Sequence, residues 1–305
     1  MSDLTLAGSF SAATREHLAR LREGEGKVRV DGDLDGVHLM RTSCRRLRAT
    51  LKFLGDPLPG KSRRRLQNGL RELMTALGGV RDLDVLRQAL DTVPGMETAE
   101  GEELKESVEE RLSGATVRMQ EVLDGDDYPR LLGDLEAAAA VADDGVPACR
   151  VGPARIGSAL SGVLELQPAD WTAASGESLH DLRKSVKKLR YALEAFAPAY
   201  GRPVARAIER CRALQESLGT IQDAAAFGEH LKEARSFAAG QFTATLKARS
   251  GRELEALPGL WKKTFGPKGL SRLGAHLFRR TIKATPRETA SEKELGEQEP
   301  QRQVV

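Results

Sequence analysis

The chain has 305 residues, with 47 lysines and arginines against 44 aspartates and glutamates, 40% hydrophobic residues and 4% aromatic residues. A chain of this length buries a substantial core in one large domain or two smaller ones, and the regular recurrence of Leu, Ala and Val excludes disorder throughout. No apolar run approaches the ~20 residues that span a bilayer, and the N-terminal residues lack a secretory signal. We therefore expect a cytoplasmic protein without a membrane span.

Helical periodicity dominates the chain, and the alternating pattern of strands is absent. In the first half, the pattern and the helix-breaking residues predict helices at 9–23, 33–54, 61–77, 82–91, 98–123 and 128–142. In the second half, they predict helices at 153–166, 176–197, 203–218, 222–240, 241–256 and 269–284. Gly78 and Gly219 are expected to end helices, with Asp82 and Asp223 as N-caps of the next ones. The fold class is therefore predicted to be all-α.

The small net charge of +3 hides a strong segregation of charge along the chain. Residues 37–71 contain ten lysines and arginines against one acid, and residues 179–212 contain nine against three. Between these two basic segments, residues 97–144 contain fifteen acids and four bases. A third basic segment lies at 262–283, and its role is open. Segregation of this kind favours an anionic partner.

The two main basic segments are copies of one another. The segment VHLMRTSCRRLRATLKFL (37–54) aligns with LHDLRKSVKKLRYALEAF (179–196) at an offset of 142. A second pair, LRELMTALGGVRDLDVL (70–86) and CRALQESLGTIQDAAAF (211–227), aligns at an offset of 141. We therefore predict an internal duplication, with one helical bundle in residues 1–145, a second in 146–285 and a disordered polar tail in 286–305.

Each copy carries a row of positive side chains along one helix. At 3.6 residues per turn, His38, Arg41, Arg45, Arg48 and Lys52 lie on one face beside an apolar face, and His180, Arg183, Lys187 and Arg190 repeat the row. Like charges at i,i+4 cost roughly 0.2–0.5 kcal/mol per pair, and acids are nearly absent from the rows. A solvated helix surface explains one such row, but two copies with the same spacing favour an extended polyanion as the ligand.

At these residues the sequence resembles the CHAD family, the conserved histidine α-helical domain. The resemblance lies in His38-x-x-Arg41-x-x-x-Arg45-Arg46-Leu47-Arg48, in the segment 179–196 and in LGGVRDLD (77–84), and it covers roughly residues 9–285. It implies two four-helix bundles related by a pseudo-twofold axis, with a basic groove or pore between them. It further implies binding of inorganic polyphosphate, often with targeting to polyphosphate granules, and no catalytic reaction.

The resemblance, together with the basic rows, suggests a set of ligand contacts. The expected polyphosphate-binding residues are His38, Arg41, Arg45, Arg48, Lys52, His180, Arg183, Lys187 and Arg190, with Arg46, Lys184 and Lys188 as neighbouring candidates. One departure stands out, since RDLD (81–84) in the first copy becomes QDAA (222–225) in the second. Arg81 therefore has no basic counterpart, and the groove is expected to be asymmetric.

Other classes of protein find less support in the sequence. A P-loop, an H-E-x-x-H motif and a C-x-x-C motif are absent, and Cys44, Cys149 and Cys211 have no metal-ligand spacing, so we expect no cofactor or metal. The E-x-E-x-K motif of a triphosphate-hydrolysing domain is also absent. A nucleic-acid-binding protein is the first alternative, although the rows lack the interleaved aromatic residues that stack on bases. A histidine phosphotransfer module is the second.

Overall fold

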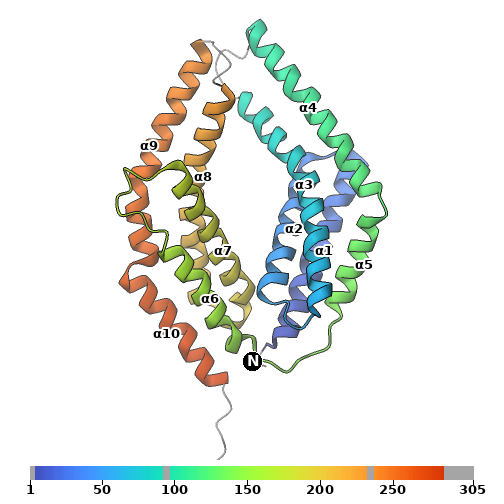
Figure 1. Ribbon diagram of the computed structural model, residues 1–305, viewed down its shortest axis with the longest axis vertical. Helices are drawn as coiled ribbons and strands as arrows, with labels where there is room; N and C mark the ends of the chain where they lie inside the picture. Colours follow the sequence, from blue (N-terminus) through green and yellow to red (C-terminus); the bar gives the residue numbers. More distant parts are fainter. Residues whose placement is uncertain (1–3, 92–96, 232–236, 285–305) are drawn as a thin grey trace, which may run out of the picture.

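The computed structural model describes residues 4–91, 97–231 and 237–284, which fold almost entirely into α-helices (Figure 1). The helices are α1 (Leu6–Asp31), α2 (Leu34–Phe53), α3 (Gly60–Leu90), α4 (Ala99–Asp124), α5 (Asp127–Ala139), α6 (Ala148–Leu164), α7 (Gly176–Tyr200), α8 (Arg202–Leu231), α9 (Phe237–Phe265) and α10 (Pro267–Ala284). No strand occurs within these ranges, which confirms the all-α prediction. The tail predicted at 286–305 lies outside the described residues.

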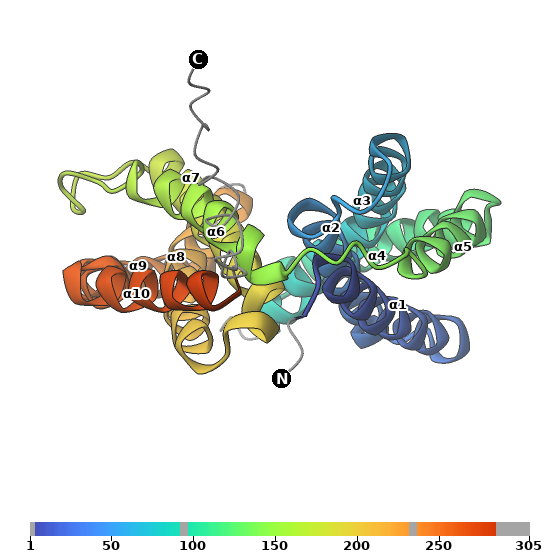
Figure 2. The same ribbon diagram turned by 90° about the horizontal axis from the view of Figure 1, so that it is seen from below.

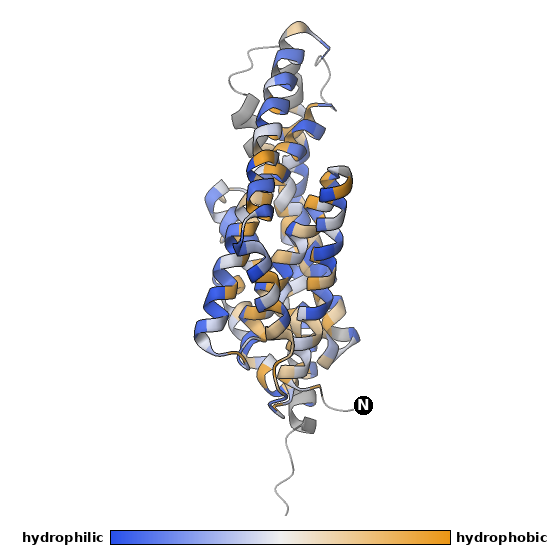
Figure 3. Cartoon of the chain, turned by 90° about the vertical axis from the view of Figure 1, so that its right-hand side faces the viewer, coloured by the Kyte–Doolittle hydropathy of each residue, from blue (hydrophilic) through white to orange (hydrophobic). Residues whose placement is uncertain are grey.

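The helices pack in two groups along the chain. Helices α1 to α5 pack mainly on one another, as do α6 to α10, and the groups lie side by side (Figures 1 and 2). Hydrophilic and hydrophobic residues alternate around each helix (Figure 3), and the buried apolar side chains form the core. The main helix contact between the groups joins α2 to α7, the two helices that carry the basic rows. The fold therefore places the two rows next to each other.

Two predicted helix ends are wrong, because Gly78 and Gly219 lie inside the continuous helices α3 and α8. A β-carbon on Gly78 would lie 3.2 Å from Nη1 of Arg41, and one on Gly219 would lie 3.3 Å from Nη2 of Arg183. Each glycine therefore lets an arginine of the neighbouring helix approach the helix backbone. This close approach explains why glycine occurs there despite its cost of about 1 kcal/mol relative to alanine in a helix.

Arg155 joins the two groups near the end of α2. Its guanidinium donates to the carbonyl oxygens of Lys52 at 3.3 Å and Phe53 at 3.0 Å, and it forms an ion pair with Asp56. These carbonyls belong to the last turn of α2, where backbone acceptors lack partners within the helix. Arg155 on α6 therefore fixes the end of α2 relative to the second group.

We expect Arg155→Ala to lower the free energy of unfolding by about 1.5–3 kcal/mol, the usual worth of hydrogen bonds to a charged group. Thermal or urea unfolding followed by circular dichroism measures the loss. Arg150→Ala is the matched control, since Arg150 lies exposed on the same helix. Equal effects of the two substitutions would contradict this role for Arg155.

Candidate anion-binding site

The first basic row lies on α2, an amphipathic helix whose N-terminus is capped. The side chain of Asp33 caps its first turn by accepting from the backbone N–H of Asp35 at 2.8 Å. Met40, Cys44 and Leu47 are buried on the core side. Between these apolar positions, Arg41 reaches α3, where it donates to the carbonyl oxygen of Gly78, and Arg45 lines a cavity shared with α3 and α7.

The second basic row lies on α7, which begins in a similar way. Ser175 accepts from the backbone N–H of Ser178 at 3.1 Å, and Leu182, Val186 and Leu189 are buried in the second group of helices. The contact between α7 and α2 then places Lys187 within electrostatic range of Arg45.

Between α2, α3 and α7 lies a cavity of about 530 Å³, called here the basic cavity. Six basic side chains line it, and none of its lining residues is acidic; the six are Arg45, Arg48, Lys52, Lys184, Lys187 and Lys188. Gln67 and Met74 of α3 and Tyr191 of α7 complete much of the wall. Positive side chains from both rows therefore converge on one cavity.

Burial, with neighbouring positive charges, lowers the pKa values of three cations in this cavity. Burial, followed by the charges of Arg45, Arg183, Arg190 and Arg41, lowers the pKa of Lys187 to about 8. Burial also lowers the pKa of Arg45, and burial with the charge of Lys188 lowers that of Lys52. Each shift means that the protein disfavours the charged form, so an anion in the cavity would relieve the repulsion.

Two polar atoms of wall residues also favour an anion as the ligand of the cavity. Nε of Arg45 and the hydroxyl of Tyr191 are buried and have no hydrogen-bond partner among the described residues. A buried polar group without a partner costs roughly 1–3 kcal/mol. Both groups are hydrogen-bond donors of the kind that a phosphate oxygen accepts from.

Other predicted contacts lie beyond the wall of the basic cavity. Arg41 donates to the carbonyl oxygen of Gly78 at 3.2 Å and to the carboxylate of Asp82 at 2.9 Å. Nε of Arg183 is buried without a partner among the described residues, next to Gly219. His38 and His180 are exposed near the starts of their helices. Burial and the charges of Arg81 and Arg45 lower the pKa of His38, so its neutral form predominates at pH 7.

Two more predicted contacts, Arg46 and Arg190, meet at Glu194 instead. Arg190 is buried, donating to Glu194 at 2.9 Å and to Gln215 at 2.9 Å, and Arg46 lies 3.6 Å from Glu194. The single acid at the end of the second row thus pairs with both of these arginines. Neither is among the residues lining the basic cavity.

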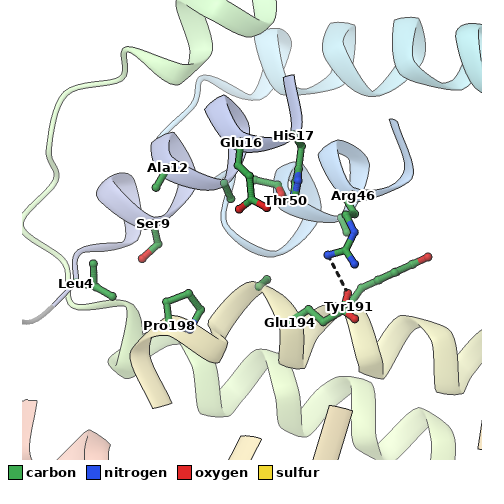
Figure 4. Close-up of a pocket in the computed structure, with 13 residues that line it drawn as sticks. Leu4, Ser9, Ala12, Glu16, His17, Arg46, Thr50, Tyr191, Glu194 and Pro198 are labelled. Carbon is green, nitrogen blue, oxygen red and sulfur yellow. Dashed lines mark ion pairs between the residues drawn. The ribbon is translucent and has the colours of Figure 1, made fainter. Parts of the chain in front are cut away.

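A second pocket of about 230 Å³, called here the mixed pocket, opens between α1, α2 and α7 (Figure 4). Its lining includes Glu16 and His17 of α1, Arg46 of α2 and Glu194 of α7, so it holds charges of both signs. Burial lowers the pKa of His17 to about 4, which leaves its ring neutral at pH 7.

Sequence reasoning missed the contributions of α3 and of Tyr191 to the basic cavity. Gln67 and Met74 belong to no charged pattern, and only the packing of α3 against α2 brings them to the wall. Tyr191 directly follows Arg190 of the second row, and this position was the one sequence feature that could have indicated its place in the wall. Among the described residues, no group of three or more His, Cys, Asp or Glu is placed to hold a metal ion. No helix in the described ranges is long and apolar enough to cross a bilayer.

Comparison with known proteins identifies a family. The CHAD domain model matches residues 12–232. Two uncharacterized proteins of Mycobacterium tuberculosis, from strains CDC 1551 and H37Rv, are each 29% identical over 233 residues, covering 72% of this chain and 44% of theirs. The chain thus spans less than half the length of these relatives.

Two solved structures share the fold. The crystal structure of the CHAD domain from the plant Ricinus communis has 25% sequence identity and a TM-score of 0.62, covering 91% of this chain and 93% of that one. PptA from Streptomyces chartreusis has 15% identity and a TM-score of 0.55, covering 85% of this chain and 99% of that one.

Proposed function

The chain belongs to the CHAD domain family, and from that premise we propose that it binds inorganic polyphosphate without catalysing a reaction. The observation that carries the proposal is the basic cavity, where six cations converge with no acid in the lining. Polyphosphate is a flexible chain of phosphates and carries no bases. It therefore fits a narrow cationic cavity better than a nucleic-acid duplex would fit there. Arginine forks and lysine ammonium groups are well suited to its oxygen atoms.

The binding residues follow from the same geometry. Arg45, Arg48 and Lys52 from α2, with Lys184, Lys187 and Lys188 from α7, hold the phosphate chain in the cavity. His38, Arg41, His180 and Arg183 extend the path toward the starts of α2 and α7, where they meet a longer chain. In the cell, this binding places the protein in the cytoplasm, at polyphosphate granules.

The proposal includes an internal duplication of the domain, with repeats in 1–145 and 146–285 related by a pseudo-twofold axis. The helix starts support it: α1 and α6, α2 and α7, and α3 and α8 each begin 142 residues apart. Gly125 and Gly266, which separate α4 from α5 and α9 from α10, lie 141 residues apart. If each of those pairs is counted as one bent helix, each repeat contains four helices.

Isothermal titration with long-chain polyphosphate tests the proposal at physiological salt. We expect saturable binding that releases counterions from the polyanion. Incubation with polyphosphate, followed by release of inorganic phosphate, tests the absence of catalysis. No measurable binding, or steady hydrolysis at the cavity, would contradict the proposed function.

The pH dependence of binding provides a sharper test of Lys187. Because the pKa of Lys187 is lowered to about 8 by burial and by Arg45, Arg183, Arg190 and Arg41, this side chain loses its charge as the pH rises through 8. Polyphosphate favours the charged form, so affinity is greatest below pH 8 and falls by up to about tenfold between pH 7 and pH 9. Titration across this range measures the fall.

Lys187→Arg is the control for this experiment, because arginine stays charged throughout the range. Its affinity is expected to be much flatter between pH 7 and pH 9. A wild-type affinity that does not change over the range would contradict the contact between Lys187 and phosphate.

A further inference from the structure

The mixed pocket and the basic cavity lie on opposite sides of one structural motif, the contact between α2 and α7. We propose that Glu194 restricts polyphosphate to the basic cavity, by reversing the charge of the equivalent position in the other half of the protein. The inference rests on the proposed function and deepens it: the protein has two openings beside the same helix contact, and it binds the polyanion in only one of them.

The equivalence of the two central pairs of residues follows from their positions in the sequence. Arg46 and Glu194, which meet at 3.6 Å in the mixed pocket, correspond at the offset of 142 to Lys188 and Lys52. Lys52 and Lys188 both line the basic cavity, where the charge of Lys188 acts on Lys52. The same contact between α2 and α7 therefore occurs twice, as a repulsive pair of lysines on one side and as an ion pair on the other.

Ala49 and Tyr191 strengthen the equivalence. They are also 142 residues apart, and they are the two residues that line both openings. A pseudo-twofold axis passing between them would exchange Ala49 with Tyr191, and Arg46 and Glu194 with Lys188 and Lys52. The outer walls differ, because α1 lines only the mixed pocket and α3 lines only the basic cavity.

The charges explain why the mixed pocket rejects a polyanion. The carboxylate of Glu194 lies 2.9 Å from Arg190, 3.6 Å from Arg46 and 3.9 Å from Arg212, and Arg46 is the only one of these arginines in the lining of the mixed pocket. Glu16 adds a second carboxylate to the lining, and the ring of His17 is neutral. A phosphate chain entering here would meet two carboxylates, and to bind Arg46 it would have to displace Glu194 (Figure 4).

Hydrogen exchange with short-chain sodium polyphosphate distinguishes the two openings, because each has one wall of its own. Residues 67–74 of α3 include wall residues of the basic cavity alone, and residues 9–17 of α1 include wall residues of the mixed pocket alone. A bound ligand slows exchange in the wall that it stabilises. In the wild-type protein we expect added protection in 67–74 and none in 9–17.

Glu194→Lys is expected to open the second site. In this variant, polyphosphate protects residues 9–17 as well as 67–74, and the amount of phosphate bound at saturation increases. Glu109→Lys, at an exposed position on α4, makes the same change in net charge and is expected to leave the protection pattern of the wild type unchanged.

Glu194→Gln keeps the inference testable if the lysine variant fails to fold, since it removes the charge and retains the shape. It is expected to give partial protection of 9–17. Protection of 9–17 in the wild-type protein, or its absence in every folded Glu194 variant that still binds, would overturn the inference. A wild-type protein that binds no polyphosphate would overturn the proposed function itself.

Discussion

The double charge reversal Arg45→Glu with Lys187→Glu is expected to weaken polyphosphate binding by at least about 100-fold. Arg45 and Lys187 approach each other from α2 and α7, and both line the basic cavity. Hydrogen bonds to charged groups contribute about 1.5–3 kcal/mol each, so losing two of them costs about 3 kcal/mol or more. The two new carboxylates add repulsion. Isothermal titration with long-chain polyphosphate measures the change.

The matched control for this reversal is Lys262→Glu with Lys263→Glu. These lysines are exposed in the last turn of α9, line neither opening and give the same change in net charge. We expect the control to reduce affinity less than about threefold, through general electrostatics alone. Equal losses in the two double variants would show that overall charge, and not the cavity, governs binding.

A single substitution guards against misfolding of the double variant. In Lys187→Glu, the new carboxylate faces Arg45 and can form an ion pair, so the folded state is retained. Its affinity is expected to fall by about tenfold or more, and its thermal unfolding, followed by circular dichroism, to remain cooperative. A folded Lys187→Glu protein with wild-type affinity would contradict the site assignment.

Raising the salt concentration is also expected to weaken polyphosphate binding strongly. Each cation that binds a phosphate releases condensed counterions, so log affinity falls linearly with log salt. By analogy with nucleic acids, a site with about six phosphate contacts loses on the order of 10³-fold in affinity between 50 mM and 200 mM salt. Titrations at several salt concentrations measure the slope.

The slope also reports how many cations take part. Substituting Lys188, one of the six cations in the cavity, by glutamine is expected to reduce the slope by about one contact. The same substitution at Lys262 is expected to leave the slope unchanged. A nearly flat salt dependence would contradict a site built from the six cations.

The amphipathic periodicity of the chain was enough to predict the all-α fold and the basic faces of α2 and α7. Periodicity indicates which side of a helix is buried. This prediction is correct wherever apolar and charged residues recur on opposite faces at 3.6 residues per turn. The expectation that glycine ends a helix failed at Gly78 and Gly219, and Asp82 and Asp223 are not N-caps, because α3 and α8 continue through them. Glycine occurs there because an arginine on another helix approaches the backbone. No pattern within one helix records that approach.

The candidate site was predicted less completely than the fold, for a related reason. The sequence places Arg45 and Arg48 in the first row and Arg46 beside it as a neighbouring candidate. In the structure, Arg45 and Arg48 line the basic cavity, and Arg46 lines the mixed pocket. Which opening an arginine lines depends on the side of the contact between α2 and α7 on which its side chain lies. Glu194 was visible as the only acid near the end of the second row, but its three arginine partners come from α2, α7 and α8.

Thermal unfolding in the presence of different polyanions tests most directly the claim that the protein binds polyphosphate specifically. The protein is heated with long-chain polyphosphate, single-stranded DNA or duplex DNA, matched for phosphate concentration at physiological salt. A ligand that binds only the folded state at a hundredfold excess over Kd stabilises it by about 2.7 kcal/mol. The account predicts a clear rise in Tm with polyphosphate and much smaller shifts with either DNA. Equal shifts with all three would instead identify a general polyanion surface, and no shift with polyphosphate would contradict the account.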